Sequence, residues 1–116
     1  MKTFNVEAAL EFTGGESDLL NELLVSFVDD KKFTLSQLED EEKKDKAEAA
    51  KFVHYYKGAG RQIAAEKLAF YGQQLEDYLR GKSEGNGKSL EELNQDFFRE
   101  YYLAVEAVKN YLAGVS

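Results

Sequence analysis

The sequence predicts an all-α domain, folded as an antiparallel up-down-up-down four-helix bundle with a short N-terminal capping helix. Leu occurs 14 times against one Ile, seven Val and three Thr, so residues that favour helices outnumber those that favour strands. No Pro interrupts the 116 residues, which permits long helices. Apolar residues recur at helical spacing along most of the chain, and short connections between amphipathic helices favour antiparallel neighbours.

The first half of the chain predicts a short helix and a long one. Asn5 can cap a helix over residues 6–12, which the glycines at 14 and 15 end. A second helix begins at Ser17 or the neighbouring Glu16, and we expect it to continue, with a bend near residues 29–32, to about residue 41. Its apolar stripe consists of Leu19, Leu20, Leu23, Leu24, Phe27, Val28, Leu35 and Leu38.

Three further long segments follow a charged run at residues 39–46. Asp45 can cap the first of these helices, and the second begins near Ala65. The loop GKSEGNGK at residues 81–88 separates the second helix from the third, which is the last helix of the chain. Ser89 and Glu92 have the spacing of a capping box at the start of that last helix. The expected inward residues are Ala49, Val53, Tyr56, Gly60 and Ile63, with Phe52 at the margin, then Leu68, Tyr71, Gly72, Leu75 and Leu79, and finally Leu90, Leu93, Phe97, Tyr101, Ala104, Val108 and Leu112.

The composition excludes several classes of functional site. The absence of Cys excludes disulfides, Cys-ligated zinc, iron–sulfur clusters and thiol catalysis, and a single His excludes sites that need two imidazoles from one chain. A net charge of −7 opposes a nucleic-acid partner. No apolar run reaches bilayer length, and Met1 is not followed by the apolar region of a signal peptide. We therefore expect one cytoplasmic domain over residues 1–116, without membrane insertion.

The single histidine, His54, points away from the predicted core. A helix turns by about 100° per residue, so the apolar stripe centres about 220° from His54, while Lys57, Gly58 and Arg61 lie within about 60° of it. A glycine inside a helix costs about 1 kcal/mol relative to Ala. Gly60 faces the stripe, where close helix packing is a sufficient reason. Gly58 faces outward, which makes sense if another molecule must approach the imidazole closely.

The next helix can supply a group that orients this imidazole. Gln73, Glu76 and Arg80 form a polar line that would border His54 if the two helices are antiparallel neighbours. A carboxylate or amide that accepts from the imidazole Nδ1–H would fix the tautomer and leave the Nε2 lone pair facing outward. Glu76 could instead pair with Arg80 on its own helix. The histidine and the nearby cations could also be ordinary solvated surface residues.

The segment from His54 to Gly60, His-Tyr-Tyr-Lys-Gly-Ala-Gly, resembles the H-x-x-K-G-x-small motif of histidine phosphotransfer (HPt) domains. Further matching features are Phe12-Thr13-Gly14-Gly15 with the leucine stripe that follows it, Ala64-Ala65-x-x-Leu68, and Leu75-Glu76. The similarity covers roughly residues 5–80 and is weak in the last helix.

This resemblance implies that the chain carries a phosphoryl group on His54. HPt domains exchange it with the aspartate of response-regulator receiver domains, and in some systems they accept it from a sensor histidine kinase. The family pattern places Lys57 beside the phosphoryl group and Gly58 where the receiver approaches. It places Glu76 or Gln73 in a hydrogen bond with the ring.

The implied domain is a carrier without turnover of its own. Arg61 can help to offset the charge of the transferred group, and Arg80 is a further candidate binding residue. The Mg²⁺ that the reaction needs would belong to the receiver, so we expect no metal or cofactor held by this chain. We also expect a monomer.

Two positions depart from the family pattern. Tyr56 stands where Leu is common, and it keeps a large inward side chain. Ala64 stands where Gly is frequent, and it would be strained if that backbone needs a positive φ. We expect a tighter or more helical turn at Ala64.

Three alternatives compete with the carrier, and they are a metal-dependent bundle oxidase, an inactive bundle that binds receivers, and a plain structural domain. Di-iron bundles use Glu-x-x-His pairs, but the residue three before His54 is Lys51 and there is no second histidine. An inactive bundle that binds receiver domains without transfer would keep the apolar contact surface but would not need His54 and Lys57.

Overall fold

The chain folds into α-helices. A computed structural model describes residues 1–29 and 33–114, which contain six helices and no strand. The helices are α1 (Val6–Phe12), α2 (Ser17–Asp29), α3 (Leu35–Lys44), α4 (Lys46–Gln62), α5 (Glu66–Leu79) and α6 (Leu90–Leu112). The all-α class is confirmed for this part of the chain.

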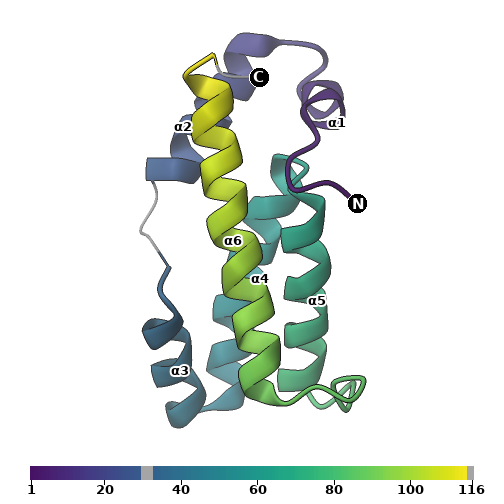
Figure 1. Ribbon diagram of the computed structural model, residues 1–116, viewed down its shortest axis with the longest axis vertical. Coiled ribbons are helices and arrows are strands. Elements are labelled where there is room, and N and C mark those ends of the chain that lie inside the picture. The colour runs from purple at the N-terminus through teal and green to yellow at the C-terminus, as the bar shows by residue number, and fades with distance from the viewer. Residues whose placement is uncertain (30–32, 115–116) are drawn as a thin grey trace.

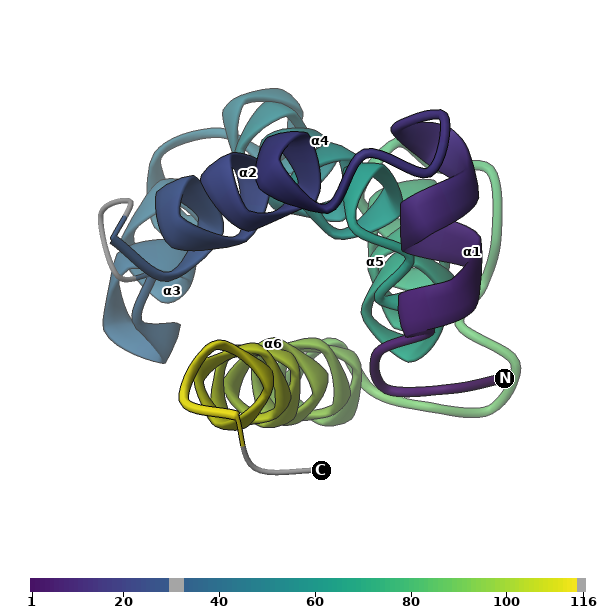
Figure 2. The same cartoon turned by 90° about the horizontal axis from the view of Figure 1, so that it is seen from above.

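Helices α4, α5 and α6 lie lengthwise in an elongated molecule of 40 × 24 × 21 Å (Figure 1). The chain ascends in α4, returns in α5 and ascends again in α6, and α5 packs against both of the others. Helix α3 lies beside α4 at the lower end, whereas α1 and α2 lie at the upper end (Figures 1 and 2). None of the helices in the described ranges is long and apolar enough to cross a membrane.

Local caps explain where several helices begin. The side chains of Asn5 and Asp45 each accept a hydrogen bond from a backbone N–H of the first helical turn, at 3.1 and 3.0 Å. Ser89 and Glu92 form the predicted capping box at the start of α6. These three helix starts are therefore confirmed.

The single long helix expected over residues 17–41 is wrong. Helix α2 ends at Asp29, and α3 begins at Leu35 after Thr34, whose backbone is extended with φ −119° and ψ 153°. The Thr34 side chain then caps α3 in a capping box with Gln37. Residues 30–32 of the expected helix lie outside the described residues. Because the leucines of α3 continue the helical spacing of α2, periodicity alone does not reveal the interruption.

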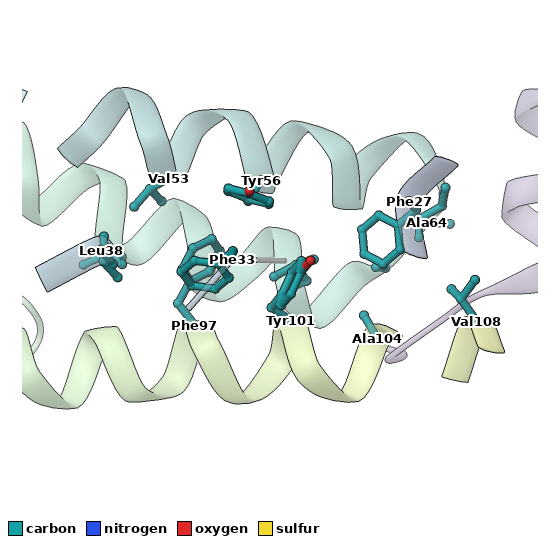
Figure 3. Packing of buried hydrophobic residues seen from close by; sticks show 14 of the residues in the cluster. Phe27, Phe33, Leu38, Val53, Tyr56, Ala64, Phe97, Tyr101, Ala104 and Val108 are labelled. Atoms are coloured by element: carbon teal, nitrogen blue, oxygen red, sulfur yellow. The ribbon is translucent and has the colours of Figure 1, made fainter. Parts of the chain in front are cut away.

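The interruption lets Phe33 enter the core. Its ring centroid lies 4.9–5.6 Å from the centroids of five other aromatic rings, and Figure 3 shows it beside Phe97. These rings are Phe52, Tyr56, Phe97, Phe98 and Tyr101. Most of the predicted inward residues are buried. Leu19 is 42% exposed. The remaining exceptions are half-buried, and they are Leu23, Val28, Leu35, Phe52, Tyr71, Leu90 and Leu112.

Glycines bring α4 and α5 close together. A Cβ at Gly60 would lie 2.8 Å from Leu68 Cδ2, which confirms the packing reason expected for this glycine. A Cβ at Gly72 would lie 2.9 Å from Phe97 Cε1 and 3.0 Å from Lys57 Cβ. The close approach places polar side chains of the two helices within hydrogen-bonding distance.

The turn between α4 and α5 is left-handed at Ala64, with φ 58°. The expectation of a tighter or more helical turn is therefore wrong. This conformation costs a residue with a Cβ roughly 1–2 kcal/mol. The Ala64 carbonyl accepts a hydrogen bond from the Asn5 N–H at 2.9 Å, so the strained turn also anchors the N-terminal segment.

Candidate functional site

His54 lies on α4 outside the core, as the sequence predicts, with 64% of its side chain exposed. Its Nδ1 faces α5, at 3.1 Å from Glu76 Oε2 and 3.3 Å from Glu76 Oε1. An ionised carboxylate only accepts hydrogen bonds, so in the neutral ring Nδ1 carries the proton and Nε2 has the free lone pair. This tautomer is assigned from hydrogen-bond geometry.

Glu76 is ionised and held by two cations. Its side chain is 7% exposed, its Oε1 lies 2.7 Å from Lys57 Nζ, and its Oε2 lies 2.9 Å from Arg80 Nε. Burial raises the pKa of Glu76, but hydrogen bonds from Lys57 and Arg80 and the charges of Lys57 and His54 outweigh it, so this pKa lies below its ordinary value. Glu76 thus makes both of the contacts considered for it, to the imidazole and to Arg80.

Lys57 is buried and is not a solvated surface cation. Only 5% of its side chain is exposed, and its Nζ also donates to Gln73 Oε1 at 2.9 Å. Helix α5 covers this flank of α4, and the missing Cβ at Gly72 leaves space for the Lys57 stem. The angle on a helical wheel does not say which neighbouring helix covers a flank. In this geometry Lys57 holds Glu76 in place.

Gln73 links cations and does not orient the ring. Its Oε1 accepts from Lys57 Nζ and also from Arg61 Nη2 at 3.2 Å, while its Nε2 donates to Asp77 Oδ1 at 2.8 Å. Asp77 is not among the site residues expected from the sequence. Its position four residues after Gln73 on the same helix is the signal that could have found it.

The charges around the imidazole leave a positive surplus. Glu76 supplies one negative charge, while Lys57 and Arg80 supply two positive charges bonded directly to it. Arg61 adds a third positive charge through Gln73, and Asp77, which Gln73 also bonds, adds a second negative charge, so three cations face two carboxylates. The carboxylate that orients His54 is therefore neutralised locally, in a chain whose net charge is −7.

A hollow of about 330 Å³ lies beside His54. It is lined by Gly58 and Tyr55 of α4, and by Leu23 and Phe27 of α2, among others. A Cβ at Gly58 would have no neighbour within 4 Å, so packing inside the chain does not require this glycine. Gly58 faces outward, as its helical position predicts, whereas the contribution of α2 depends on tertiary packing and could not be predicted from the sequence.

The imidazole of His54 can act as a nucleophile towards an anionic electrophile. One nitrogen of an accessible imidazole has a free lone pair, the other is bonded to a fixed carboxylate, and cations lie behind that carboxylate. Within the described ranges, no group of three or more His, Cys, Asp or Glu side chains could hold a metal ion. No protein-family model, curated protein or solved structure matches the chain.

Proposed function

We propose that this chain is a histidine phosphotransfer domain, which carries a phosphoryl group on His54 to or from the aspartate of a response-regulator receiver domain. The contact of 3.1 Å between His54 Nδ1 and Glu76 Oε2 carries the proposal. It leaves the Nε2 lone pair available on the exposed side of the ring. The resemblance of residues 54–60 to the HPt motif independently supports this function.

In the transfer step, the one bond that forms is matched by one bond that breaks. The Nε2 lone pair of His54 forms a bond to phosphorus as the P–O bond to the receiver's aspartate breaks, and that aspartate leaves as a carboxylate. The ring then bears phosphorus on Nε2 and a proton on Nδ1, so it is positively charged. Ionised Glu76 stabilises this charge, and the reverse step returns the neutral imidazole.

The surroundings suit an incoming phosphoryl group. Phosphoryl transfer depends mainly on positioning and charge stabilisation. The surplus positive charge from Lys57 and Arg80 offsets the negative charge of the transferred phosphoryl group. Arg61 is exposed and close enough to this network to bond Gln73. Lys57 contributes through Glu76, a different role from the direct phosphoryl contact that the family resemblance implies.

The receiver would approach over Gly58 and the hollow beside His54. The missing side chain at Gly58 and the apolar lining from Leu23 and Phe27 provide an open surface next to the nucleophile. The receiver would bring the Mg²⁺. In the same proposal α2 and α3 together make the first arm of a four-helix bundle, with α4, α5 and α6 as the other three.

The direct test is phosphorylation of the purified protein by two donors. One donor is a set of receiver domains carrying a labelled aspartyl phosphate, with Mg²⁺, and the other is phosphoramidate, whose P–N bond makes it a small-molecule donor that needs no partner. We expect an acid-labile, base-stable label on the native chain and none on His54→Gln. Because His54 is largely exposed, that substitution should change the free energy of unfolding by about 0.5 kcal/mol or less.

Lys51→Gln is the matched control, since Lys51 is exposed on α4 one turn before His54. It should keep the label. A label that survives His54→Gln would refute the site, and no label from either donor would refute the carrier function. Receiver binding without any transfer would favour the inactive adaptor.

A further inference from the structure

A carboxyl–amide pair joins α3 to α6, away from His54, and consists of the half-buried Glu42 and the buried Asn94. Asn94 of α6 is 3% exposed, and its Nδ2 donates to Glu42 Oε1 of α3 at 2.8 Å. The two remaining oxygens of this pair, Glu42 Oε2 and Asn94 Oδ1, are both shielded from solvent and have no hydrogen-bond partner. Both are acceptors when Glu42 is ionised, so neither can satisfy the other.

A single proton would satisfy both oxygens. A protonated carboxyl has one O–H donor and one C=O acceptor, which matches the C=O acceptor and N–H donor of an amide. We propose that Glu42 binds a proton on Oε2 and donates it to Asn94 Oδ1, so that the neutral carboxyl and the amide form a two-bond ring that fastens α3 to α6. One bond of this ring is the Nδ2–Oε1 hydrogen bond already present. This inference does not depend on the proposed phosphotransfer.

The groups around Glu42 favour the neutral form on balance. Burial raises its pKa most, the hydrogen bond from Asn94 lowers it, the charge of Glu39 on α3 raises it, and the charge of Lys46 on α4 lowers it; the net pKa lies above the ordinary value. Lys43 of α3 and Glu91 of α6 line a hollow beside the pair. Glu42 lies in the last turn of α3, where the helix dipole disfavours a negative charge.

The ring would make the α3–α6 contact sensitive to pH. A group whose pKa is raised by folding contributes stability below its ordinary pKa and loses that contribution as the pH rises through the raised value. When Glu42 loses its proton, one bond of the ring disappears and a shielded negative charge remains between the helices. Helix α3 should therefore be held more firmly to α6 in acid than at neutral pH.

The substitution Glu42→Gln tests this directly. A Gln amide can donate to Asn94 Oδ1 and accept from Nδ2, so it closes the same ring without a proton. We expect its melting temperature at pH 7 to exceed that of the native chain by about 4 °C, and the difference to shrink as the pH falls. Asp40→Asn is the matched control, because it replaces a carboxylate by an amide at an exposed position on α3.

A second measurement observes the proton itself. The ¹³C resonance of the Glu42 carboxyl, followed by NMR against pH, should have a higher midpoint in the folded chain than in the urea-unfolded chain. The proposal is overturned if the folded midpoint is not higher, or if Glu42→Gln stabilises the chain no more than Asp40→Asn does. An ionised carboxylate hydrated from the neighbouring hollow would give both of these results.

Discussion

Replacing Gly72 by Ala should destabilise the fold, although Ala is the better helix former. The added Cβ would lie 2.9 Å from Phe97 Cε1 and 3.0 and 3.1 Å from Lys57 Cβ and Cγ. Phe97 is fully buried, and Lys57 is held at its Nζ, so neither can move away cheaply. Overpacking costs about 1–3 kcal/mol, and the gain in helix propensity returns about 1 kcal/mol. Three contacts of 3.1 Å or less place the overpacking cost in the upper part of its range, at about 2–3 kcal/mol, so we expect a net loss of about 1–2 kcal/mol.

Thermal unfolding followed by circular dichroism measures this loss. For 116 residues, 1 kcal/mol corresponds to roughly 4 °C, so the melting temperature of Gly72→Ala should fall by about 4–8 °C. Gly58→Ala is the matched control, because no atom lies within 4 Å of its added Cβ. It should gain about 0.5–1 kcal/mol from helix propensity alone. If Gly72→Ala melts as high as Gly58→Ala, the close packing of α5 against Lys57 and Phe97 is refuted.

Three further outcomes follow from the same contacts. Glu76→Gln leaves Lys57 buried without its counter-charge and should cost about 3 kcal/mol or more at pH 7 in urea unfolding. Because folding lowers the pKa of Glu76, ionised Glu76 stabilises the fold above the ordinary pKa of 4.5, and this contribution is lost as the pH falls through the lowered pKa. The difference in the free energy of unfolding between the native chain and Glu76→Gln should therefore narrow in acid. A difference that does not change with pH would contradict this. Ala64→Val should lose about 2 kcal/mol because a β-branched residue tolerates φ 58° poorly, whereas Ala64→Gly relieves the strain of the Cβ and should not lose stability; equal melting temperatures of the two variants would contradict the left-handed turn. Ser89→Ala removes the cap of α6 and should cost about 1 kcal/mol in thermal unfolding, and no loss would contradict its capping role.

Much of the helix pattern was predictable because its causes are local. Asn5, Asp45 and Ser89 cap their helices through backbone groups only two or three residues away, so their positions in the sequence are sufficient evidence. Periodicity identified most buried residues for the same reason. It failed between α2 and α3, because Leu35 continues a helical spacing across an extended Thr34.

The candidate site was predictable in its members but not in their contacts. The helical angle placed His54 outside the core, and the spacing of Gln73, Glu76 and Arg80 put them on one line. Which of them bonds the ring depends on how α5 lies against α4. The structure brings Glu76 to Nδ1 and brings Gln73 to the cations.

The sequence by itself determined where several helices start, that one accessible histidine lies outside the core, and which polar residues can reach it. Only the tertiary structure decided that Lys57 is buried, that Phe33 enters the core, and that Glu42 meets Asn94. The physical reason is the range of the interactions. Caps and helical faces are set within one or two turns, whereas a buried lysine or carboxyl is stabilised by partners from another helix, whose approach depends on the packing of the whole chain.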